Sequence, residues 1–158
     1  MTNAVNDAPA IIRIPTAFIV AICVTALVAT VLQVMHSVTV LRELGAPVES
    51  GQALAMFAHD LMGFGLNFLG IAAVGFLIAF VVTALLRRVI PVSTVGLHAL
   101  AGGVAIYTAL KTITAITGIT PIPASLEFPW MAGLVASGVL GGLLYGVLAR
   151  AGDNVLKP

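Results

Sequence analysis

Four long apolar segments constrain the fold of this chain more than any other feature of its sequence. They cover residues 15–41, 61–86, 92–116 and 130–149. Each reaches the ~20 residues that a helix needs to cross about 30 Å of hydrocarbon, and none alternates with the period of two that marks a membrane barrel strand. Only 8% of the residues are charged, against about 25% in soluble domains. We therefore predict an all-α, polytopic membrane protein with four transmembrane helices in an up-down bundle.

Prolines and glycines predict where the helices begin and end. Pro15 is expected in the first turn of the first helix, where its missing N–H costs nothing. Gly45 and Pro47 should end that helix. The first segment is too long, and its basic flank too weak, for a cleaved signal peptide, so we expect a retained helix. Within a single domain, 1–158, the predicted helices cover residues 15–44, 53–88, 92–117 and 130–150.

Basic residues predict how the helices are threaded through the membrane. Five of them fall on one side of the predicted bundle: Arg13, Arg87, Arg88, Arg150 and Lys157. Arg42 alone falls on the other side, and Lys111 lies inside the third helix. Because positive charge stays in the cytoplasm, we expect both chain ends there, with residues 42–58 and 117–129 facing outward.

Small residues on the last predicted helix favour close packing between helices. In lipid, helices associate through close backbone approach, because apolar side chains gain little by leaving acyl chains. Two neighbouring ridges of small residues share this helix: Gly138, Gly142 and Gly146 on one, and Gly133, Ser137 and Gly141 on the other. We expect both to pack inside the bundle. The alternative is that one of them docks a partner chain.

Polar side chains gather towards the predicted outer side. Seven of them converge there if the helices alternate in direction: Gln33, His36, His59, Asp60, Asn67, Lys111 and Glu127. Ionisable groups inside a membrane are costly and mark functional candidates, so we predict an outward cavity that binds a ligand. Lys111 either snorkels outward, pairs with Asp60 or Glu127, or binds an anionic ligand. Asp60 also suits a helix start, where the dipole is positive, unless that helix begins earlier, near Gly51.

Methionine and histidine side chains on the same side raise a metal hypothesis. Thioether and imidazole ligands suit copper(I). The candidate ligands are Met35, His36, Met56, His59 and Met62. His36 and His59 would also be the axial ligands of a haem. Methionine is otherwise a flexible gap filler in apolar helices, so we expect no resident cofactor, with copper and haem as the alternatives.

Motifs for catalysis and nucleic-acid binding are absent from the sequence. It contains no nucleophile elbow, phosphate loop or dinucleotide fingerprint, so we predict no catalytic residue. A net charge of +1, with scattered basic residues, gives no nucleic-acid patch. The leading hypothesis is a small accessory or structural subunit packed against other membrane subunits or copies of itself. The alternatives are a transporter or binding protein for a lipid or small solute, using the outward cavity, and a copper-binding protein.

Three short motifs carry a resemblance. HDLMG at 59–63, AVGFLIAF at 73–80 and GITPI at 118–122 resemble a group of small four-helix inner-membrane proteins of proteobacteria with no assigned activity. The resemblance implies the same threading and a bacterial inner-membrane location. Members follow GITPI with small residues and an arginine, whereas this chain continues with PASLEF. If that arginine neutralises the aspartate matching Asp60, this chain must use Lys111 or another group.

Overall fold

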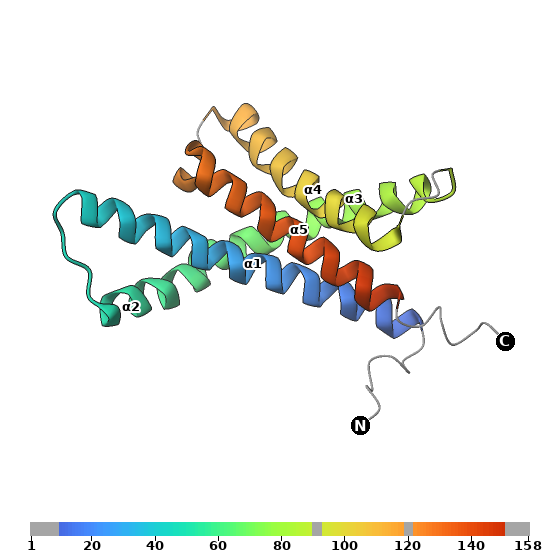
Figure 1. Cartoon of the computed structure of the whole chain (residues 1–158), viewed down its shortest axis with the longest axis horizontal. Coiled ribbons are helices and arrows are strands. Elements are labelled where there is room, and N and C mark those ends of the chain that lie inside the picture. Colours follow the sequence, from blue (N-terminus) through green and yellow to red (C-terminus); the bar gives the residue numbers. More distant parts are fainter. Residues whose placement is uncertain (1–9, 90–92, 119–121, 151–158) are drawn as a thin grey trace, which may run out of the picture.

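The computed structural model describes residues 10–89, 93–118 and 122–150, which form helices and short connections (Figure 1). The α-helices are α1 (Ala10–Glu43), α2 (Ser50–Asp60), α3 (Leu66–Leu86), α4 (Thr94–Thr117) and α5 (Phe128–Arg150). A π-helical turn, η1 (Leu61–Gly65), joins α2 to α3 without a break, and a 3-10 turn, η2 (Pro123–Leu126), precedes α5.

Among the residues that the structure describes, four helical spans are long and apolar enough to cross a membrane. They are Ile11–Glu43, Ser50–Leu86, Thr94–Thr117 and Phe128–Ala149. Large apolar side chains also lie on the outer surface of the bundle: Leu77, Ile78 and Val81 of α3 are each more than half exposed. Such a surface suits lipid better than water. The all-α class and the four apolar spans predicted from the sequence are therefore confirmed.

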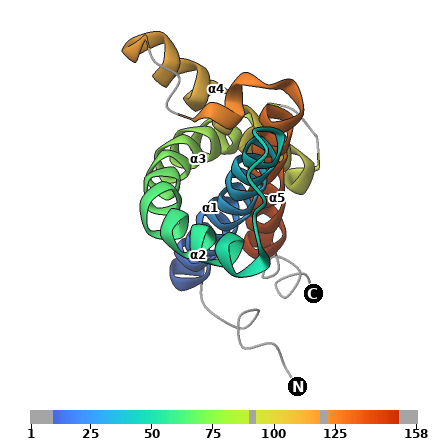
Figure 2. The same ribbon diagram turned by 90° about the vertical axis from the view of Figure 1, so that its left-hand side faces the viewer.

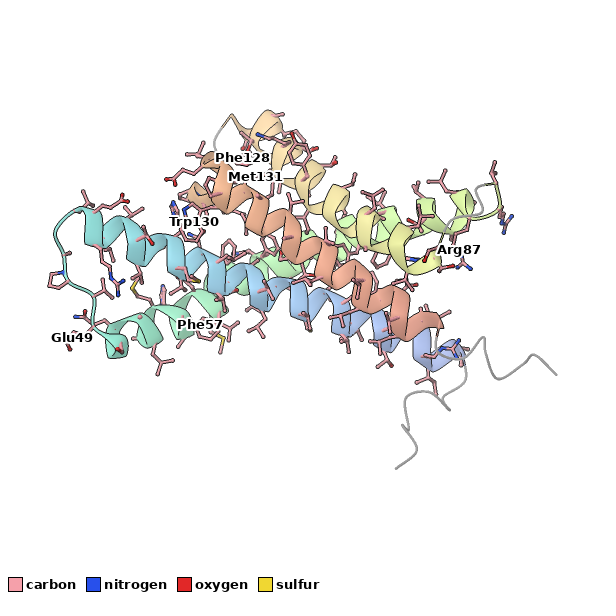
Figure 3. The ribbon with its side chains drawn as sticks, in the orientation of Figure 1. Glu49, Phe57, Arg87, Phe128, Trp130 and Met131 are labelled. Atoms are coloured by element: carbon pink, nitrogen blue, oxygen red, sulfur yellow. The ribbon has the colours of Figure 1, made fainter. Side chains whose placement is uncertain are left out.

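The helices form a bundle in which α5 lies between α1 and α4 (Figures 1 and 2). α3 packs against both α4 and α1, and α2 packs on the C-terminal half of α1. We call one end of the bundle the Arg87 end, because the start of α1 and the ends of α3 and α5 lie there (Figure 3). The opposite end, with the α1–α2 turn and the first turn of α5, is the Glu127 end.

The core of the bundle is built from one apolar face of each long helix. Phe68 and Phe76 of α3, Ile106 of α4 and Leu134 of α5 are fully buried, and they close on the alanine-rich face of α1 around Ala21. Small residues on α1 leave room for the large α3 phenylalanines at the centre of the bundle.

Glycines on the first ridge of α5 bring it to backbone distance from α4. A methyl group at Gly138 would lie 2.5 Å from the Gly102 carbonyl oxygen. One at Gly142 would overlap the His98 carbonyl oxygen, and one at Gly146 would lie 2.9 Å from Val95 Cα. Only glycine fits these positions at the observed separation.

The second ridge of α5 faces α1. A methyl group at Gly141 would overlap the Thr25 hydroxyl, and one at Gly133 would lie 3.2 Å from Leu32 Cδ1. The Thr25 hydroxyl is also 3.4 Å from the Ser137 carbonyl oxygen, to which it donates a hydrogen bond. Both ridges are thus occupied inside the chain, and neither is left free to dock a partner.

Two helix starts differ from the sequence prediction by three residues or more. α1 begins at Ala10, so the placement of Pro15 in its first turn is wrong; the proline lies inside the helix and removes one helical hydrogen bond there. The second span begins at Ser50 and not near residue 53. Its N-cap is Glu49, whose backbone N–H donates to Gln52 Oε1 at 3.1 Å. This local cap extends the helix beyond its apolar segment.

Candidate functional site

A groove of about 870 Å³ runs between α3 and α4 on the outside of the bundle. It extends from Asn67 and Ile113 at the Glu127 end to Leu86 and Leu97 at the Arg87 end. Its volume lies within the range of roughly 300–1,000 Å³ found for ligand pockets. In a membrane this groove faces the acyl chains, so an apolar chain can enter it sideways.

Small residues and helix divergence together create the groove. α3 and α4 meet near their midpoints, where a methyl group at Gly75 would be 3.5 Å from Ala105 Cβ. From there their Glu127 ends diverge (Figures 1 and 2). Ala101 and Gly70 also line the groove, and Gly70 has no atom within 4 Å of where its Cβ would be. With larger residues at these positions the groove would be filled.

Polar groups line the groove only towards its Glu127 end, apart from Thr83 near the other end. The Gly75–Ala105 contact sets the antiparallel register of α3 and α4. Asn67, eight residues before Gly75, is therefore level with residue 113, eight residues after Ala105. Thr108 and Thr112 stand one turn apart on the same wall of α4. The groove thus combines a long apolar section with a hydrogen-bonding end.

The predicted outward cavity is not one site. His36 is buried between α1 and the start of α5, with Nε2 3.5 Å from Glu127 Oε1 and its ring edge-on to Trp130. Gln33 Oε1 is buried nearby on α1 and accepts no hydrogen bond from the described part of the chain. Asn67 instead lines the α3–α4 groove. The sequence placed these side chains at a common depth, but they face different gaps between helices.

Lys111 is exposed on α4. Its ammonium group lies over the Tyr107 ring, 5.9 Å from the centroid. Among the residues that the structure describes, it makes no ion pair with Asp60 or Glu127, and the ion pair of Glu127 is with His36. The interpretation of Lys111 as a structural bridge is therefore wrong for this structure.

The HDLMG motif (residues 59–63) overlaps the start of the π-helical turn η1 (Leu61–Gly65). Asp60 ends α2 and is the last of its 11 residues, so the explanation of its charge by a helix start is wrong. In η1 the Gly63 carbonyl oxygen accepts a 2.9 Å hydrogen bond from Asn67 Nδ2. A Cβ on Gly65 would be 3.0 Å from the Thr30 hydroxyl of α1. Such single π-helical turns are frequent at functional sites, and this one sets the direction in which α3 begins.

The candidate metal ligands are divided among different environments. Met35 and Met62 are 53% and 73% exposed, His59 is exposed on α2, and Met56 is half-buried. The Nε2 atom of His36 faces Glu127. Within the described part of the chain, no three histidine, cysteine or acidic side chains are grouped as a metal site would require.

An aromatic cluster near the Arg87 end was not anticipated. The Phe80 ring stacks on Tyr145 with centroids 4.2 Å apart, and His98 lies 5.2 Å from Phe80. His98 Nδ1 donates to the Thr94 carbonyl oxygen at 2.7 Å, which fixes the ring. His98 is thus a packed core residue. The spacing of Phe76 and Phe80 on one face of α3 was the only signal in the sequence.

Fold and groove together define a helical protein with membrane-spanning character and a lateral groove on the outside of its bundle. No family model, curated protein sequence or solved structure matches the chain. The resemblance to small proteobacterial inner-membrane proteins therefore stays a prediction.

Proposed function

We propose that this chain is a non-catalytic membrane protein that binds the apolar chain of a membrane amphiphile in the α3–α4 groove. The observation that carries this is the groove of about 870 Å³, apolar over most of its length and polar towards one end. A molecule with a hydrocarbon tail and a polar headgroup has the same division. This proposal keeps the alternative of a lipid-binding protein from the sequence analysis, but its site is the α3–α4 groove and not the predicted outward cavity.

A second candidate function is a subunit of a larger complex, with a partner's transmembrane helix in the same groove. The small residues Gly70, Gly75 and Ala101 of the lining favour it, because small residues allow two helix backbones to approach closely. Native mass spectrometry of gently extracted protein separates the two. A retained lipid mass supports the first function, and a retained protein partner supports the second.

The location and orientation are also part of the proposal. We infer a bacterial inner membrane with both chain ends in the cytoplasm. Arg13, Arg87 and Arg88 support this, because they lie at the Arg87 end of the bundle, whereas Arg42 lies towards the other end. Positive charge is retained on the cytoplasmic side. The polar end of the groove then faces outward.

Photocrosslinking tests the groove directly. The full chain is reconstituted with a phosphatidylcholine that carries a diazirine in one acyl chain, and labelled residues are identified by mass spectrometry. Val74 and Val104 line the groove, whereas Leu77 and Val81 are equally exposed on the outside of α3. We expect several-fold more label at the two groove positions. Equal labelling at all four would mean ordinary annular lipid and would overturn the proposal.

A matched pair of glycine variants sharpens this test. Gly70→Leu places a side chain in the groove, and Gly63→Leu places the same side chain outside it. Neither glycine has an atom within 4 Å of where its Cβ would be, so neither change forces the backbone apart. Gly70→Leu should lower labelling at Val74, and Gly63→Leu should leave it unchanged. Equal effects of the two variants would contradict the proposal.

A further inference from the structure

Lys111 of α4 carries a charge that its surroundings do not neutralise. It lies within the apolar span Thr94–Thr117 and is exposed on the lipid side of α4. Its charged end lies over Tyr107, and the described residues give it no carboxylate partner. A cation inside hydrocarbon is costly, so such residues are matched by an anion or reach the interface.

The direction of the side chain argues against snorkelling. Side chains on a helix lean towards its N-terminus, and the N-terminus of α4 lies at the Arg87 end. Tyr107 is one turn back from Lys111 in this direction, and the ammonium group lies 5.9 Å from its ring centroid. The charge is thus held deeper than the Cα of Lys111, away from the nearer, Glu127 end.

Lys111 lies next to the polar end of the groove, one residue before Thr112 on α4, although its side chain is not part of the groove lining. Thr108 and Thr112, on adjacent positions of the same helix, line the groove there, and Asn67 lines it from α3. The hydroxyls and the amide donate and accept hydrogen bonds, and the ammonium group donates three. The apolar section of the groove takes a hydrocarbon chain, which a free inorganic anion lacks.

We propose that the amphiphile is an anionic lipid whose phosphate headgroup binds Lys111, Thr108, Thr112 and Asn67 while one acyl chain lies in the α3–α4 groove. This rests on the proposed function, because it names the ligand of the same groove. Charge complementarity selects the headgroup: a net anionic lipid neutralises Lys111, whereas the choline of a zwitterionic lipid carries a cation of its own.

Two probes with the same diazirine acyl chain test the headgroup, one a phosphatidylglycerol and one a phosphatidylcholine. The ratio of their labelling at Val104 is measured in bilayers of fixed composition. A lysine near the membrane surface favours an anionic lipid by a factor of about five. Lys111 lies inside the span, where water screens its charge less, so we expect a ratio of at least this size. Lys111→Leu should bring it to about one, and Lys111→Arg should keep it, because arginine also binds phosphate.

Arg88→Leu is the matched control, because it removes an exposed cation at the far end of the bundle. It should leave the ratio unchanged, and phosphatidylcholine labelling of Val104 in Lys111→Leu shows that the groove is intact. A ratio that survives Lys111→Leu overturns the inference. If both probes label Val104 of the unmodified chain equally, and more than they label Leu77, the inference about the headgroup is overturned. The proposed function then still stands. Val104 labelling no higher than that of Leu77 overturns both.

Discussion

Gly138→Ala should destabilise the bundle by forcing α4 and α5 apart. The added methyl group would lie 2.5 Å from the Gly102 carbonyl oxygen, which is 0.9 Å short of the 3.4 Å at which ordinary contact begins. The Gly102 atom belongs to the backbone and cannot turn away, so the helices must separate locally by about this distance. A gap of 0.5–1 Å forfeits roughly a quarter to a half of each dispersion contact.

The expected loss of unfolding free energy is about 1–3 kcal/mol, as for other overpacked sites. Alanine's better helix propensity, about 1 kcal/mol over glycine, works against the loss. Gly70→Ala is the control, because the same methyl group meets nothing within 4 Å. It should be neutral or slightly stabilising.

Unfolding in mixed detergent micelles, titrated with dodecyl sulfate and followed by circular dichroism, measures both variants. A Gly138→Ala protein as stable as the Gly70→Ala protein would refute the argument, since it would mean that α4 and α5 do not meet at backbone distance.

Three further outcomes follow from other parts of the bundle. Phe80→Ala should lower the unfolding free energy by about 3–5 kcal/mol in the same titration, because the ring is buried among four aromatic neighbours. Its control, Leu77→Ala at an exposed position of α3, should change it by no more than about 0.5 kcal/mol. Similar losses in the two variants would contradict the packing around Phe80. A double-mutant cycle of unfolding free energies for His36→Ala and Glu127→Gln should give a coupling energy of about 0–1 kcal/mol, because the Glu127 side chain is 58% exposed. A much larger coupling energy would mean that the pair is shielded from water. Protein from copper-fed cells should hold far less than one copper per chain by elemental analysis, and stoichiometric copper that disappears in His59→Ala would contradict this.

Position along the helices was not enough to predict which polar side chains lie together. His36 and Asn67 were expected to converge because both lie towards the same end of the predicted bundle. In the bundle His36 turns towards Glu127, whereas Asn67 lines the α3–α4 groove. Depth follows from position along a helix, but the direction of a side chain depends on the rotation of that helix about its axis. Packing with the other helices fixes this rotation.

The sequence by itself determined properties of single segments of the chain. Apolar length decides that a segment crosses hydrocarbon, because each unpaired backbone group there costs several kcal/mol and only a complete helix pairs them all. The four spans could therefore be predicted from residues 15–41, 61–86, 92–116 and 130–149 alone. The small residues of α5 indicated close approach for the same reason.

Only the tertiary structure decided which helices approach and what they leave open. It placed Gly138 against Gly102 and Gly141 against Thr25, inserted the π-helical turn after Asp60, and left the groove beside Gly75 and Ala105. These features depend on contacts between residues far apart in the chain. In lipid, where apolar contact with a neighbour is worth little more than contact with an acyl chain, shape complementarity between whole helices selects among them.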